Sequence, residues 1–175
     1  MANTITINRA PVLTLWAAVV AQRLGFKEDE ALTLGKAVAG LNAQAKGRRL
    51  GIFKPHEEKP KEARVKKRGE EFWIEVCGRP VPAKNTKEGI RAVKGAEPID
   101  PVGVRRYLQS KFGNDFDRVH KAMAKLSKAF KPKELADVAF RLYERFRPAI
   151  PENVSGWGAK GDLDLGLIES LAKRG

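Results

Sequence analysis

Apolar residues recur at helical spacing over two stretches of the chain, one near its start and one from about residue 100 onward. Residues three and four apart share one face of a helix, so this pattern predicts amphipathic helices. Glycine or proline follows most of the predicted helices and marks where they end. The predicted helices span residues 11–24, 27–47, 100–112, 114–130, 132–147 and 162–172.

Alternating patterns predict a smaller amount of strand. Residues 4–7 alternate and include β-branched side chains, and residues 72–76 place Phe, Ile and Val on one face. Residues 78–80 predict a turn. Residues 81–83 are expected to return as a short edge strand, since proline is tolerated at sheet edges. Residues 54–70 are charged, contain two prolines and indicate a solvated connector.

The expected fold is therefore mainly α, a bundle of about six helices with a small β-hairpin element. We divide the chain into a strand and helical hairpin (1–50), a charged connector with a β-hairpin (51–98) and a C-terminal helical bundle (99–175). These parts form either one compact domain or two lobes. The pattern does not fix the oligomeric state.

The composition adds a strong positive charge. The 175 residues include 34 Lys and Arg against 21 Asp and Glu, a net charge of +13, and residues 101–150 hold 12 basic and 5 acidic residues, or +7 of that total. Such an excess indicates an acidic partner. The only cysteine is Cys77 and the histidines are His56 and His120, so we expect no disulfide, no metal site and no cofactor. No catalytic motif is recognisable, so an enzyme is not the favoured class.

The longest apolar stretch, residues 10–24, is shorter than a membrane span and lacks the features of a signal peptide. We therefore expect a cytoplasmic protein that does not bind membranes.

A row of basic residues on the helix at 114–130 is the leading candidate site. Arg118, Lys121, Lys125 and Lys128 fall within about 80° of arc at 100° per residue, opposite the apolar face. Lys131 and Lys133 extend this row, and Arg105 and Arg106 flank it. Such a row predicts sequence-independent binding to nucleic-acid phosphates, to DNA before RNA.

Three other interpretations of this row and its surroundings stay open. Most charge runs are ordinary solvated faces. A protein-interaction module that docks an acidic partner would carry the same charge. The third alternative is an enzyme that acts on a phosphorylated substrate through the loop from Trp157 to Lys160.

Residues 17–36 resemble a helix-turn-helix unit, with Ala21 where the helices touch and Gly25 opening the turn. A DNA-reading unit places the start of its second helix in the major groove. Here that start carries Glu28, Asp29 and Glu30, which phosphates would repel. We therefore interpret the unit as a helical hairpin that builds the core.

Two further segments are candidate binding loops. Residues 156–161 spell G-x-G-x-x-G, but no strand-helix-strand unit surrounds them, which excludes a dinucleotide fold. Trp157, Gly158 and Lys160 would then form either a phosphate or interaction loop, or a structural turn plugged by the tryptophan. The basic cluster at 64–68 beside Trp73 is a weaker candidate for gripping nucleic acid.

The stretches at 9–25, 30–47, 106–113 and 156–165 resemble a family of prokaryotic proteins of similar length to which no function is assigned. The resemblance runs along most of the chain. It implies a cytoplasmic prokaryotic setting and no activity, cofactor or functional residue.

Overall fold

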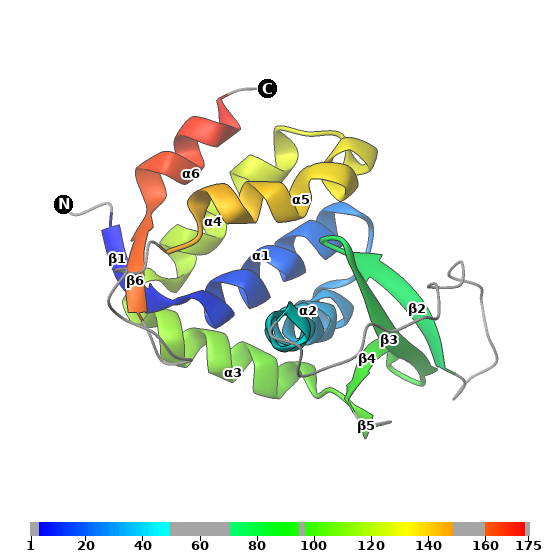
Figure 1. The fold of residues 1–175 in the computed structure, drawn as a ribbon. Coiled ribbons are helices and arrows are strands. Elements are labelled where there is room, and N and C mark those ends of the chain that lie inside the picture. Colours follow the sequence, from blue (N-terminus) through cyan, green and yellow to red (C-terminus); the bar gives the residue numbers. More distant parts are fainter. Residues whose placement is uncertain (1–3, 50–70, 95–96, 149–159, 174–175) are drawn as a thin grey trace.

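Helix α1 (Arg9–Arg23) runs through the centre of the molecule in the computed structural model of the protein (Figure 1). The structure describes residues 4–49, 71–94, 97–148 and 160–173. Every residue from Pro11 to Ala21 is buried, so the helix is covered on all sides and not on one face. This position explains why its sequence is so uniformly apolar. Within the described residues, no helix is both long and apolar enough to cross a membrane.

Helices α2 to α5 pack around α1, and α6 packs on α4 (Figure 1). They are α2 (Glu28–Arg49), α3 (Pro101–Phe112), the 3-10 turn η1 (Gly113–Asp115), α4 (Phe116–Lys128), α5 (Pro132–Phe146) and α6 (Leu165–Ala172). Side-chain caps set two of the helix starts. The Asp100 carboxylate accepts from the Val102 N–H at 3.0 Å, and the Asp164 carboxylate accepts from the Leu167 N–H at 3.3 Å. A capping acid and a proline at the first helical position made the start of α3 visible in the sequence.

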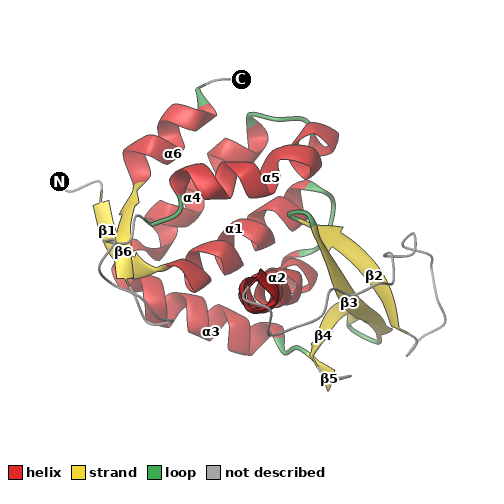
Figure 2. Cartoon of the chain, in the orientation of Figure 1, coloured by secondary structure: helices red, strands yellow, loops and turns green. Residues whose placement is uncertain are grey.

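The expectation of a mainly α protein with one small hairpin is wrong. The described chain contains two antiparallel sheets and is a mixed α/β fold (Figure 2). One sheet pairs β1 (Thr4–Asn8) with β6 (Lys160–Asp164). The other has the order β2 (Glu71–Val76), β3 (Arg79–Thr86), β4 (Gly89–Lys94) and β5 (Glu97–Pro98).

Strand β3 shows why the sheet was underestimated. Residues 81–83 were expected as a short edge strand, yet β3 has eight residues and lies between β2 and β4. Pro80 and Pro82 pair only with β2, opposite Glu75 and Trp73, because β4 joins the ladder from Ala83 onward. The prolines therefore lie on a locally unpaired side of an inner strand, where their missing N–H groups leave no ladder bond unmade.

Side chains of α2 bind two backbone N–H groups of β4, at residues before the short stretch where β4 pairs with β5. The Glu30 carboxylate accepts from the N–H of Lys27 through Oε1 and from the N–H of Ile90 through Oε2, both at 2.9 Å. One helical turn later, Thr33 Oγ1 accepts from the Ala92 N–H at 3.0 Å. Two strand donors that would otherwise face the helix unpaired are thus satisfied, which fixes the sheet against α2.

Helices α1 and α2 approach each other closely at Gly35. A Cβ at this position would lie 2.3 Å from the Thr14 carbonyl oxygen and 3.2 Å from the Ala18 Cβ. Only a glycine allows the two backbones to approach this far. The low helix propensity of Gly35 is therefore offset by the packing it permits.

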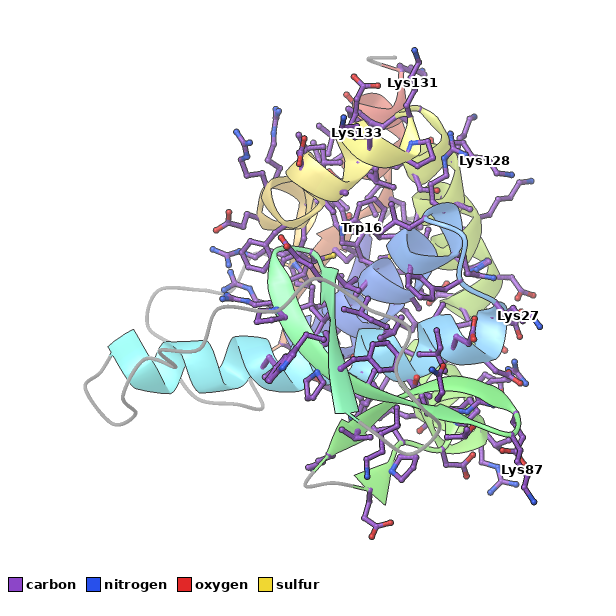
Figure 3. The ribbon with its side chains drawn as sticks, turned by 90° about the vertical axis from the view of Figure 1, so that its right-hand side faces the viewer. Trp16, Lys27, Lys87, Lys128, Lys131 and Lys133 are labelled. Carbon is purple, nitrogen blue, oxygen red and sulfur yellow. The ribbon has the colours of Figure 1, made fainter. Side chains whose placement is uncertain are left out.

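Trp16 joins α1 to α5 in the middle of the core (Figure 3). Its indole N–H donates to the Ala139 carbonyl oxygen at 2.9 Å, and its ring meets the edge of Phe146 with centroids 5.3 Å apart. Buried side chains from all three of the expected segments belong to the same hydrophobic cluster. The hairpin, the four-stranded sheet and the later helices thus share a core.

Candidate nucleic-acid interface

Helix α4 presents three exposed lysines on one face: Lys121, Lys125 and Lys128. Val119 and Leu126 on the opposite face are fully buried. The lysines are thus carried by a helix that the core holds rigidly from behind. Among the described side chains, none of the three forms an ion pair with an acid.

Two arginines of the predicted site are engaged elsewhere. Arg118 Nη2 lies 2.9 Å from the Asp115 carboxylate, and both side chains are about 40% exposed. Arg105 Nη2 pairs with the Glu28 carboxylate and lies 3.3 Å from that of Asp29. A phosphate would have to compete with these carboxylates, so neither arginine belongs to the strongest part of the surface.

The other predicted cations remain exposed. Lys131 and Lys133 lie on the turn into α5, directly after the lysine face of α4, and Arg106 lies on α3. The Lys131 backbone N–H donates to Glu134 Oε1 at 3.2 Å, which caps the start of α5. We define the α4 lysine surface as Lys121, Lys125, Lys128, Lys131 and Lys133.

Arg23 is a contributor that the sequence analysis missed. Its guanidinium donates to the carbonyl oxygens of Ser127 at 3.3 Å and Phe130 at 2.9 Å, and so holds the end of α4 against α1. Cations favour helix C-termini, so this contact stabilises the turn that carries Lys128 and Lys131. A pair separated by more than one hundred residues leaves no local signal in the sequence.

Lys27 and Lys87 lie along the same edge of the molecule as Lys128 (Figure 3). Exposed acids accompany both of them, Glu28 and Asp29 beside Lys27 and Glu88 beside Lys87. Their fields partly cancel. The edge below Lys128 is therefore a weaker anion surface than the α4 lysine surface.

The α4 lysines also have a structural role. Lys125 and Lys128 lie in the last turn of α4 and Asp117 in its first turn, an arrangement that complements the helix dipole. Helix stability thus accounts for part of the charge pattern. Nucleic-acid binding is a separate property and needs a test that distinguishes the two.

The helix-turn-helix-like residues 17–36 form the end of α1 and the start of α2, joined through Gly25 at φ 113°. The first residues of α2 bind Arg105, while Glu30 and Thr33 bind the edge of β4. The start of this helix is therefore occupied by contacts within the protein. Ala31 and Leu34 of the same unit are fully buried, so this helical hairpin contributes to the core.

Other candidates fall partly outside the described residues. The structure does not describe Trp157, Gly158 or the basic cluster at 64–68. Lys160 is described; it is exposed and lies opposite Asn8 in the β1–β6 pair. Trp73 is half-buried in β2, and His120 stacks on Phe116 with centroids 5.9 Å apart. In the described part of the chain, no cluster of three His, Cys, Asp or Glu side chains could hold a metal ion.

Cys77 occupies the β2–β3 turn and is buried. Burial raises the pKa of its thiol to about 12, which keeps the thiolate scarce at neutral pH. Its φ of 50°, followed by 73° at Gly78, matches a type I′ hairpin turn. Cys77 is therefore a turn and packing residue and a poor nucleophile.

The chain was compared with protein families, curated proteins and solved structures, and none of them matches it.

Proposed function

We propose that this protein binds nucleic acid without sequence preference, DNA before RNA, through the α4 lysine surface. The observation that carries the proposal is the row of exposed lysines on α4, which have no acidic partner among the described side chains. Lysine ammonium groups attract phosphates as point charges and carry no information about bases. Binding of this kind depends on charge and not on sequence.

The geometry of α4 suits a short run of backbone. Lys121 and Lys128 are separated by about 10 Å along the helix axis at 1.5 Å per residue. Duplex DNA advances by about 3.4 Å per nucleotide of one strand, so this length spans about three phosphates. Lys131 and Lys133 extend the row to about five contacts. The expected slope of log affinity against log salt is then between about −3 and −4.5 on duplex DNA.

Fluorescence anisotropy of labelled duplexes of two unrelated sequences, single-stranded DNA and RNA, across a salt series, tests the proposal. The variant Lys121→Gln, Lys125→Gln, Lys128→Gln should reduce the slope on duplex DNA by about 2.7, the value for three released contacts. The two duplex sequences should bind alike.

A control variant with the same loss of charge is Lys27→Gln, Lys87→Gln, Lys173→Gln, which leaves α4 unchanged. Thermal denaturation of each variant separates loss of binding from loss of the helix-dipole contribution of Lys125 and Lys128. Equal slopes of log affinity against log salt for the two variants would contradict the proposal, because the α4 lysine surface would then contribute no more to binding than other surface lysines.

We also propose that the protein acts in the cytoplasm. The buried free thiol of Cys77 supports this location, because thiols stay reduced there.

A further inference from the structure

Three lysines from three different elements lie close enough for their charges to interact, and one of them lies on the ring of Tyr107. Lys36 on α2 places its Nζ 3.9 Å from the centre of the Tyr107 ring on α3. Lys111 lies one helical turn after Tyr107, and Lys94 ends β4, which packs on α2. We define these residues, Lys36, Lys94 and Lys111, as the Lys36 cluster.

Within the part of the chain that the structure describes, the lysines of the cluster form no ion pair. Burial lowers the pKa of Lys36, and the charges of Lys94 and Lys111 lower it further. None of the causes of this shift is a carboxylate of the described residues. Glu97 lies opposite Lys94 in the β4–β5 pair, but no ion pair between described side chains includes a lysine of the cluster.

Rigid elements hold the cluster in place. Lys36 directly follows Gly35, where α2 touches α1, so its backbone position is fixed by this close helix contact. Tyr107 is half-buried in α3 beside the buried Leu108. Mutual repulsion of the lysines is therefore built into packed structure and cannot be relieved by moving the backbone.

We propose that the Lys36 cluster binds a phosphate group. A phosphate would supply the negative charge that the three ammonium groups lack, and it would accept hydrogen bonds from them. The Tyr107 hydroxyl stays protonated at neutral pH, since burial raises its pKa, so it remains able to donate. Lys36 on the ring face fixes the orientation of the aromatic group.

The phosphate has two possible sources with the same chemistry, a small phosphorylated molecule or a nucleic-acid backbone. The Lys36 cluster belongs to α2, β4 and α3 and shares no residue with the α4 lysine surface. The inference therefore goes beyond the proposed function and does not depend on it.

Isothermal titration with pyrophosphate, and anisotropy with a DNA oligonucleotide, test the site on the intact protein. The variant Lys94→Gln, Lys111→Gln removes two exposed side chains and should keep the fold. We expect it to weaken binding by about tenfold, the scale of two screened charge contacts. The control Lys27→Gln, Lys87→Gln loses the same charge outside the cluster and should bind pyrophosphate like the wild type.

The two titrations identify the source of the phosphate. Selective weakening of pyrophosphate binding supports a small phosphorylated ligand, and selective weakening of DNA binding supports a backbone contact. Weakening of both supports a site that accepts either. Equal affinities of the two variants in both titrations, or no binding by the wild type in either, would overturn the proposal.

A second readout does not depend on a variant that folds. Phosphate next to Lys36 favours its protonated form, so binding at alkaline pH should take up protons from the buffer. Titrations in buffers with different ionisation enthalpies measure this uptake, after subtraction of the protons that the phosphate ligand itself releases. No remaining proton uptake at any pH up to 10.5, the ordinary pKa of lysine, would remove Lys36 from the site.

Discussion

Thr33 on α2 accepts the backbone N–H of Ala92 on β4 at 3.0 Å, although 59 residues separate them. The same hydroxyl donates to the Glu30 carbonyl oxygen at 2.9 Å. Both Thr33 and Ala92 are fully buried. One side chain thus supplies the hydrogen bond that a neighbouring strand would give β4 at this point.

Replacing Thr33 by valine should therefore destabilise the protein by about 1–3 kcal/mol, because the buried Ala92 donor loses its acceptor. Urea denaturation at neutral pH measures the change. The control is Thr14→Val in α1. Thr14 is also fully buried, but its hydroxyl donates to the Ala10 carbonyl oxygen within the same helix. Its loss leaves no strand donor unpaired, so a change as large as that of Thr33→Val would contradict the assignment.

Gly35 and Gly40 on α2 should respond in opposite directions to alanine. Gly35→Ala forces a Cβ against the Thr14 carbonyl oxygen and should cost about 1–3 kcal/mol. Gly40 is exposed and has no atom within 4 Å of the added Cβ, so Gly40→Ala should stabilise the helix by about 0.5–1 kcal/mol. Thermal denaturation of both variants checks the pair, and a stabilised Gly35→Ala protein would contradict the close packing of α1 on α2.

Alkaline pH should unfold the protein through two buried acids. The pKa values of Cys77 and Tyr143 are both raised to about 12, from ordinary values of 9.0 and 10.0, mainly by burial. The unfolded chain releases these protons first, so each group lowers the unfolding free energy as pH rises from its ordinary pKa towards 12. The slope is at most about 1.4 kcal/mol per pH unit for each group.

Tyr143→Phe isolates the contribution of one group, since it removes the titration of Tyr143 and leaves those of Cys77 and Tyr107. Lys36 acts in the opposite direction, because its lowered pKa increases stability as pH rises. The difference in the free energy of unfolding between Tyr143→Phe and the wild type, followed across pH, is therefore more informative than the pH dependence of the wild type alone. Urea denaturation between pH 7 and pH 11 should show a shallower decline for the variant, and parallel curves would contradict the burial of this hydroxyl as the cause.

Arg105 and Arg106 are adjacent on α3 but should behave differently. Arg105→Gln breaks the ion pairs with Glu28 and Asp29 and should cost about 0.2–1 kcal/mol of stability, less at high salt. Arg106 is exposed and forms no ion pair with a described side chain, so Arg106→Gln should leave stability unchanged. Melting temperatures at low and high salt compare the two, and equal shifts would contradict the bridge from α3 to α2.

Local patterns predicted the helices better than the sheets. The start of α3 was visible because Asp100 and Pro101 are adjacent and act on the same turn. Strand β6 was not predicted: its first two residues were assigned to a glycine-rich loop and the rest to the start of the last helix, because its partner β1 lies far away in the sequence. Strand β4 was not assigned, since Arg91 and Lys94 interrupt its apolar pattern, although Arg91 is buried. Strand pairing depends on contacts between residues far apart in the sequence, which a short stretch of sequence does not reveal.

The candidate site shows the same division. The row of Lys121, Lys125 and Lys128 could be placed on one helix face from spacing. The pair of Arg118 with Asp115 was also within reach, since three residues separate them on the chain. The engagement of Arg105 and the gathering of the Lys36 cluster join elements far apart in sequence, so only the fold reveals them.

The pairing of β1 with β6 has a consequence for synthesis. Thr4 and Asp164 are partners in this pair, and the Thr6 hydroxyl also donates to the Asp162 carboxylate at 3.2 Å. A growing chain therefore displays α1, in which every residue from Pro11 to Ala21 is buried in the folded protein, long before the ribosome has made α4 and α5, which help to cover it. Chains arrested on the ribosome after residue 115, before α4 begins, should thus be readily digested by protease or held by chaperones. Protection at that length would mean that α1 and α2 find a stable arrangement of their own.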